Sequence, residues 1–277
     1  MSDIIILNSG DHVALDPTQS GFAHGFGIFE TLKLASGRLC FWEEHWQRFV
    51  RSAKELSLHV EFAEEQALEA IRELLRAEGL RDGAIKVSLM QTGAGSQCYV
   101  YSRPAMTSGG AARLLFASDS KQNEHSLLAG HKTHNYMENM LLLASARSAG
   151  CTDVVRVNAA GQLTETAVGN LFFVQGDTLY TPGVATGILP GVVRAVVLEA
   201  AGILGVSVVE GAYFPDALNL MESAFVTNSS VGIQIVDTIK IGESQREVEC
   251  AAHPMVQDLI EALATVEDGS SMLMTDD

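Results

Sequence analysis

The sequence has few basic residues, few cysteines and no long apolar run. Among its 277 residues, 18 Lys and Arg stand against 34 Asp and Glu, which gives a formal net charge of -16. Such a surface repels a polyanion, so we expect no nucleic-acid partner. No apolar run approaches membrane-spanning length, and the start, with Ile4 to Leu7 after Met-Ser-Asp, is not a signal-peptide pattern. We therefore expect a cytoplasmic protein without a membrane partner.

Cysteine and histidine spacing argues against a metal centre. Cys40, Cys98, Cys151 and Cys250 lie far apart in sequence without a CxxC pair, which is typical of small buried apolar side chains. His131 and His134 are three residues apart, but no third ligand follows at a suitable spacing. We predict no metal site.

The length and a hydrophobic content of 47% allow one large core or two modest ones. Pro104 and the Ser-Gly-Gly at 108–110 interrupt the periodic pattern, so we predict an α/β protein of two domains. The N-terminal α/β domain would cover residues 1–118 and a C-terminal domain residues 119–266. The acidic residues 267–277 are predicted to be a disordered tail.

Hydrophobic periodicity predicts the elements. The expected helices cover residues 42–56, 63–78, 135–148, 190–204 and 253–264. The expected strands cover residues 4–8, 27–34, 85–90, 97–101 and 112–117, and residues 153–181 read as a β meander. In the helix over 135–148, Met137, Met140, Leu141 and Ala144 are expected to face the core.

Three stretches together suggest one chemical device. The first contains Lys132 and Tyr136, the second Glu165 and Asn170, and the third is the glycine-rich turn Gly187 to Arg194. A lysine, a carboxylate and a helix start that binds anions are what an enzyme needs to hold pyridoxal 5'-phosphate. Tyr136 follows Lys132 by one helical turn, so both are expected to face the same ligand.

At these residues the chain resembles the class IV aminotransferases, which are fold type IV pyridoxal-phosphate enzymes. The matching motifs are Lys132-Thr133-x-Asn135-Tyr136, Thr164-Glu165-x4-Asn170-Leu171-Phe172, Gly187-Ile188-x2-Gly191-x2-Arg194 and, near the N-terminus, Gly25 to Leu32 with Glu44-His45-x2-Arg48-Phe49. Their order extends the resemblance from about residue 20 to about residue 240. It implies a small N-terminal α/β domain, a larger pyridoxal-phosphate domain with a barrel-like core, and a homodimer.

The resemblance also implies roles for individual residues. Lys132 would be the Schiff-base lysine and later the proton shuttle, and Glu165 would bind the pyridine nitrogen. Phosphate contacts would come from Arg48, the backbone N–H groups of Val192 and Val193, and the hydroxyl of Ser229. The remaining contacts to the cofactor would come from Tyr136, at the phenolic oxygen, from Leu189, on the ring face, and from Asn170.

The reaction is less determined than the cofactor. Phe29-Glu30-Thr31-Leu32 and Thr227-Asn228-x3-Gly232-Ile233 look most like aminodeoxychorismate lyases, which convert 4-amino-4-deoxychorismate to 4-aminobenzoate and pyruvate. Thr31 would contact the leaving group, and Thr92, Thr227 and Asn228 would border this small-molecule substrate. An aminotransferase for D-amino acids, branched-chain amino acids or small amines is the alternative, and a non-catalytic binding protein is a distant third. Lys33 and Arg103 are possible cations for the substrate's carboxylates.

Overall fold

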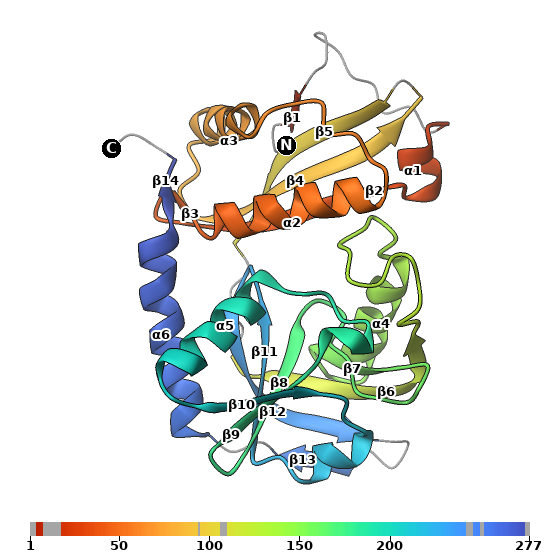
Figure 1. Cartoon of the computed structure of the whole chain (residues 1–277), viewed down its shortest axis with the longest axis vertical. Coiled ribbons are helices and arrows are strands. Elements are labelled where there is room, and N and C mark those ends of the chain that lie inside the picture. Colours follow the sequence, from red (N-terminus) through yellow and green to blue (C-terminus); the bar gives the residue numbers. More distant parts are fainter. Residues whose placement is uncertain are drawn as a thin grey trace. The chain divides into compact units, whose positions relative to one another are not determined.

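The computed structural model describes residues 4–7, 18–93, 95–105, 110–241, 246–249 and 252–274 (Figure 1). The chain divides into two compact units. Unit 1 takes Met1–Thr107, His131–Asn135 and Glu267–Asp277, and unit 2 takes Ser108–Gly130 and Tyr136–Val266. This division differs from the predicted boundary at residue 118, which falls inside a strand, β6 (Ala112–Gln122). The sequence predicts this strand only over residues 112–117, because its second half is polar and its pairing with β7 shifts register between Ala117 and Lys121.

Unit 1 is built on a sheet in the order β1-β5-β4-β2-β3-β14. Its strands are β1 (Ile4–Leu7), β2 (Gly27–Ala35), β3 (Arg38–Leu39), β4 (Gly83–Thr92), β5 (Gly95–Arg103) and β14 (Met272–Leu273). Its helices are α1 (Ser20–His24), α2 (Trp42–Glu55) and α3 (Glu64–Glu78). Helices α2 and α3 lie over one face of the sheet (Figure 1), and the core of this unit lies beneath them.

The helices of unit 1 form for reasons visible in their sequences. In α2, Phe49 and Ala53 are buried at helical spacing, and Glu43 and Glu44 in the first turn favour the positive end of the helix dipole. Helix α3 ends at Gly79, which adopts the left-handed conformation with φ 61°. Both helices agree with the predicted ranges to within one residue at each end.

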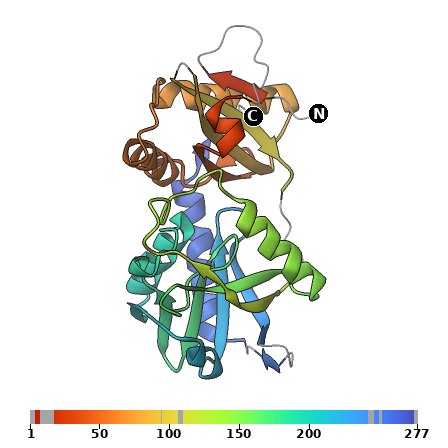
Figure 2. The ribbon, with the colours of Figure 1, turned by 90° about the vertical axis from the view of Figure 1, so that its right-hand side faces the viewer.

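Unit 2 contains a mixed sheet in the order β10-β9-β8-β11-β12-β6-β7, with β13 paired to β12. Its other strands are β7 (Asp153–Asn158), β8 (Asn170–Gln175), β9 (Thr178–Pro182), β10 (Ser207–Gly211), β11 (Ser223–Asn228), β12 (Gly232–Ile241) and β13 (Arg246–Glu249). The predicted meander is right for the β8–β9 hairpin and wrong for β7, which pairs in parallel with β6 at the other edge of the sheet. The sheet curls into an open half-barrel (Figure 2).

The helices of unit 2 pack around this sheet. They are α4 (Met137–Ser148), the 3-10 turns η1 (Val184–Thr186) and η2 (Pro215–Asn219), α5 (Val192–Ile203) and the start of α6 (Pro254–Ser270). The predicted inward face of α4 is wrong, since Met137, Met140 and Leu141 are exposed. Leu143 and Ala146 are the buried residues of this helix, and they pack against β7.

The C-terminal segment also differs from its prediction. Residues 267–270 continue α6, and Met272 and Leu273 form β14 against β3. Polar contacts explain the order of this acidic segment: Lys33 Nζ lies 2.7 Å from a Glu267 carboxylate oxygen, and Arg38 donates to Ser271. Residues 275–277 lie outside the described residues.

The architecture confirms the predicted α/β fold with a barrel-like core in the C-terminal half. Within the described residues, none of the helices combines the length and the apolar composition needed to cross a membrane.

Candidate active site

Lys132 lies in an extended segment of unit 1 and not on a helix. The Phe29 N–H donates to the Lys132 carbonyl at 2.9 Å, and the His134 N–H donates to the Gly27 carbonyl at 2.9 Å. Thr133 forms an isolated antiparallel β-bridge with Ile28. The helix that follows starts only at Met137. The expectation that Lys132 and Tyr136 share a helical turn is therefore wrong, because the backbone of residues 132–134 is hydrogen-bonded to β2.

The Phe29 ring lies close to two lysine amines. Lys132 Nζ is 4.6 Å from the ring centroid, and Lys86 Nζ is 3.9 Å from it. Both distances are within the range of cation–π attraction. Lys86 lies on β4 directly opposite Thr31 of β2, so these two side chains share the sheet face that also carries Phe29.

This face is polar, and its groups perturb one another. Burial and the nearby charge of Arg103 lower the pKa of Lys86 to about 8. Burial and the charge of Lys86 lower the pKa of His134 to about 4, so its ring is neutral at pH 7 and bonds Ser88 Oγ at 2.7 Å. Lys33, one of the two cations suggested by the sequence, is paired with Glu267. Lys86 was missed because no motif includes it.

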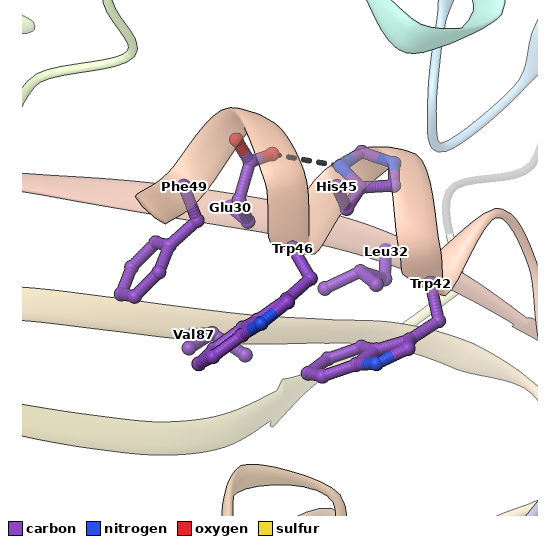
Figure 3. Close-up of a pocket in the computed structure, with 7 residues that line it drawn as sticks. All are labelled: Glu30, Leu32, Trp42, His45, Trp46, Phe49 and Val87. Carbon is purple, nitrogen blue, oxygen red and sulfur yellow. Dashed lines mark hydrogen bonds and ion pairs between the residues drawn. The ribbon is translucent and has the colours of Figure 1, made fainter. Parts of the chain in front are cut away.

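Arg48 is buried in α2 and bound to a carboxylate. Its Nε donates to Glu30 Oε1 at 2.8 Å and its Nη2 to Oε2 at 2.6 Å. His45 Nδ1 contacts the same Oε2 at 2.7 Å (Figure 3). Burial raises the pKa of Glu30, but the charge and hydrogen bonds of Arg48 and the bond from His45 outweigh it and hold the pKa far below its usual value. Glu30 therefore fixes the guanidinium for which the resemblance implies a phosphate contact.

A small gap in the core lies beside Glu30 and His45. It is lined by Glu30, Leu32, Trp42, His45, Trp46, Phe49 and Val87 (Figure 3). The gap has no room for a water molecule, and its walls are mostly aromatic and aliphatic. We assign it to the packing of α2 on the sheet and not to ligand binding.

In unit 2, the Glu165 carboxylate accepts hydrogen bonds from three neutral donors. Gln122 Nε2 donates to its Oε1 at 3.2 Å, Asn170 Nδ2 donates to its Oε2 at 3.1 Å, and the Leu189 N–H lies 3.1–3.2 Å from both oxygens. These three bonds fix the position of the carboxylate. A fixed anion of this kind is suited to hold a protonated pyridine nitrogen.

The glycine-rich turn leads into α5 close to this carboxylate. Gly191 is the N-cap of α5, and a Cβ there would lie only 2.1 Å from Asn170 Oδ1, so the position requires glycine. Val192 and Val193 are buried in the first turn of the helix. Backbone N–H groups at a helix start have no partner within the helix, and with the helix dipole they favour a phosphate.

Tyr136 is anchored to the loop that follows Glu165. Its hydroxyl lies 3.4 Å from the Ala167 carbonyl, which also accepts a 2.6 Å bond from Asn139. The Ala167 N–H donates to the buried Asp153 carboxylate at 3.0 Å. Tyr136 and Glu165 thus belong to one ordered region of unit 2.

The predicted residues 227–229 lie at the end of β11. Thr227 pairs with Asn170 of β8, and its buried Oγ1 has no hydrogen-bond partner among the described residues. The Asn228 side chain accepts from the N–H groups of Ser230 and Val231, so it shapes the turn that holds Ser229. In unit 1, the Thr92 hydroxyl donates to the Gly95 carbonyl and closes the β4–β5 turn.

Each unit by itself carries groups of the kinds that pyridoxal 5'-phosphate requires. Unit 1 carries the Lys132 amine and the Arg48 guanidinium, and unit 2 carries the fixed Glu165 carboxylate, the start of α5 and the Thr227 hydroxyl, which has no partner among the described residues. An amine, a carboxylate and phosphate donors are the groups that an enzyme with a phosphorylated pyridine cofactor needs.

Comparison with known proteins places the chain more narrowly. The family described as amino-transferase class IV matches residues 27–239, and the chain belongs to this family, whose enzymes use pyridoxal phosphate. The chain is 28% identical over 249 residues to an aminodeoxychorismate lyase of Bacillus subtilis (strain 168), covering 83% of this chain and 82% of the relative. It is 24% identical over 236 residues to a D-alanine aminotransferase of Bacillus licheniformis, covering 82% and 83%.

A solved structure agrees. A putative 4-amino-4-deoxychorismate lyase of Legionella pneumophila subsp. pneumophila str. Philadelphia 1 superposes with a TM-score of 0.83 at 26% identity, covering 94% of this chain and 97% of that one. The predicted family and fold are therefore confirmed.

Proposed function

We propose that this enzyme is a pyridoxal-phosphate-dependent lyase that converts 4-amino-4-deoxychorismate to 4-aminobenzoate and pyruvate. The similarity to the Bacillus subtilis lyase supports this reaction. The structural observation that carries the proposal is the pair Thr31 and Lys86, opposite each other on the sheet face that carries Phe29 and the Lys132 amine.

The chemistry of this face suits the lyase substrate. That substrate carries two carboxylates and an ether oxygen that must leave. Lys86 supplies a cation within an otherwise acidic protein, and Thr31 supplies a hydroxyl beside it. Beside Phe29, this face presents Thr31, Lys86, Ser88 and His134, and these polar groups suit an anionic substrate better than the side chain of a branched-chain amino acid.

Each residue then has a defined task. When bound, the cofactor supplies an electron sink at the amine-bearing carbon of the substrate. Lys132 holds the cofactor and takes the proton from that carbon. Lys86 binds a substrate carboxylate, and Thr31 donates a hydrogen bond to the departing enolpyruvyl oxygen. The products contain all the atoms of the substrate, so the reaction needs neither water nor an amino acceptor.

The cofactor contacts follow the donors described above. Glu165 binds the pyridine nitrogen, with Leu189 and Asn170 beside it. Arg48, the N–H groups of Val192 and Val193, and the hydroxyl of Ser229 hold the phosphate. Tyr136 bonds the phenolic oxygen, and Thr227 and Asn228 border the substrate.

The test is product analysis without any keto acid. Purified enzyme given 4-amino-4-deoxychorismate should release pyruvate and 4-aminobenzoate in equal amounts. Absence of pyruvate, together with transfer of an amino group from D-alanine to a keto acid, would show that the lyase proposal is wrong. The 24% identity to a D-alanine aminotransferase makes this transfer, with D-amino acids, branched-chain amino acids or small amines as donors, the second candidate function.

We also propose a homodimer in the cytoplasm. The support for self-association is an exposed apolar set in unit 2: Leu127 is 90% exposed, Met137 77% and Leu141 64%. Large apolar side chains with this degree of exposure are typical of interfaces. Sedimentation velocity should show a dimer at micromolar concentration, and a monomer there would contradict this part of the proposal.

A further inference from the structure

The three donors to Glu165 also hold the glycine-rich turn. The Gln122 amide nitrogen that donates to Glu165 also donates to the Gly187 carbonyl at 2.7 Å. The Asn170 amide nitrogen that donates to Glu165 also donates to the Leu189 carbonyl at 2.9 Å. The third donor is the Leu189 N–H itself. Each of these three donors therefore links the carboxylate to the turn over residues 187–191.

The geometry uses both hydrogens of each amide group. A side-chain NH2 has two N–H bonds, and here one points to the carboxylate while the other points to the backbone of the turn. Gln122 Oε1 is buried without a hydrogen-bond partner among the described residues, so its NH2 group alone holds this side chain by hydrogen bonds. Gln122 and Asn170 reach the turn from two strands of one sheet, β6 and β8 (Figure 1).

The turn is fitted closely to these contacts. Gly187 has φ 93°, and a Cβ there would lie 2.8 Å from Glu124 Cα, two residues after Gln122. At the other end of the turn, the side-chain oxygen of Asn170 packs against Gly191. The turn therefore has little freedom to move while the two amides remain bonded to Glu165.

We propose that Gln122 and Asn170 are positioning residues that join the Glu165 carboxylate to the phosphate-binding turn, so that the two ends of the cofactor are bound cooperatively. The inference rests on the proposed roles of Glu165 at the pyridine nitrogen and of the turn at the phosphate. Glu165 then has two tasks: it binds the ring, and it fastens the backbone that leads to Val192 and Val193. A change at Gln122 should weaken the binding of both ends, although Gln122 is assigned contact with neither.

Gln122 is the suitable position for the test. Glu165 is itself assigned to the cofactor, and Asn170 is packed too tightly against Gly191 for a clean substitution. Gln122→Met keeps the length of the side chain and removes the donor group. Gln234→Met is the matched control, because Gln234, on β12 of the same unit, donates its hydrogen bond to the Gly110 carbonyl and not to the turn.

The experiment compares two ligands that bind the apoenzyme without a covalent bond. Pyridoxamine reports the ring end, and the ratio of pyridoxamine 5'-phosphate to pyridoxamine affinity reports the contribution of the phosphate. For Gln122→Met, we expect pyridoxamine affinity to fall roughly 10-fold, as for the loss of one hydrogen bond to a charged acceptor, and the affinity ratio to fall as well. Gln234→Met should change neither. Hydrogen exchange at residues 187–193 should be faster in Gln122→Met than in the wild type, and unchanged in Gln234→Met.

The outcomes separate the inference from its basis. If Gln122→Met lowers pyridoxamine affinity but leaves the affinity ratio unchanged, or lowers neither, the coupling is refuted. A loss of stability without a change in either affinity would mean that Gln122 is only structural, which also refutes it. If Glu165→Gln binds both ligands like the wild type, the proposed role of Glu165 fails, whatever Gln122 does. Gln122→Asn, which keeps the donor on a shorter side chain, should fall between Gln122→Met and the wild type.

Discussion

Replacement of Glu30 by glutamine tests the buried network that holds Arg48. The carboxylate is 3% exposed and accepts from two nitrogens of Arg48 and from His45 Nδ1, at 2.6–2.8 Å. A glutamine has only one acceptor oxygen, and its NH2 group would face an N–H of Arg48 or His45. The variant therefore removes the carboxylate that pairs with the buried charge of Arg48.

The expected loss is large because the site cannot hydrate. Removing one partner of a buried ion pair costs about 3–5 kcal/mol, and the gap beside Glu30 has no room for a compensating water molecule. The two tryptophans of the chain, Trp42 and Trp46, line this gap, so their fluorescence during urea unfolding reports on unit 1. The exposed Glu69, which bonds Arg72 and Arg76, offers a control, and Glu69→Gln should stay close to the wild type.

The pH dependence of this difference has a defined sign. The pKa of Glu30 in the folded state is far below its ordinary value of 4.5, so its stabilisation is fully present above pH 4.5 and is lost as the pH falls towards the folded pKa. The difference in unfolding free energy between the wild type and Glu30→Gln should be constant from pH 6 to 8 and should decrease below pH 4.5. A difference under about 1 kcal/mol at pH 7 would refute the argument.

Two further predictions concern the polar face of unit 1. Lys86→Met should raise KM for the anionic substrate far more than it lowers kcat, and equal losses in kcat and kcat/KM would contradict a binding role. The KM of the wild-type enzyme should rise above pH 8 as Lys86 loses its proton, whereas the KM of Lys86→Arg should stay constant over the same range. His134 should destabilise the fold in acid, because its pKa is about 4 in the folded state and 6.5 in the unfolded state. The unfolded chain therefore binds the proton first, and the free energy of unfolding should fall by up to about 3 kcal/mol between pH 6.5 and 4. Denaturation of His134→Gln over that range should show a smaller loss, and an unchanged acid slope would contradict this.

The elements that the sequence predicts well are those whose pattern is local. Helices α2 and α3 follow from apolar residues at helical spacing and from Gly79, and β4 and β5 from their flanking turns. The exposed side of α4 could not be predicted in this way. Its apolar residues cover more than one face, and only the fold shows that Leu143 and Ala146 are the buried ones.

Long-range pairing was the second source of error. Nothing near Lys132 shows that its backbone pairs with β2, more than a hundred residues earlier, and β7 joins β6 rather than its neighbour in sequence, β8. For the same reason, the sequence does not indicate the positions of Lys86 and Gln122 in the fold. The motifs identify Lys132, Glu165 and the turn because their spacing is characteristic, whereas these two residues reach the same regions only through sheet register.

The central claim is that Lys132 carries the cofactor, and peptide mapping tests it most directly. The enzyme is loaded with pyridoxal 5'-phosphate, reduced with borohydride, digested and analysed by mass spectrometry. The account predicts a phosphopyridoxyl group on the peptide that contains Lys132 and its absence in Lys132→Ala. Lys86 is the informative competitor, because its pKa is lowered and its amine lies against the same Phe29 ring. A label on Lys86 in the wild-type enzyme, or no label on either lysine, would contradict the account.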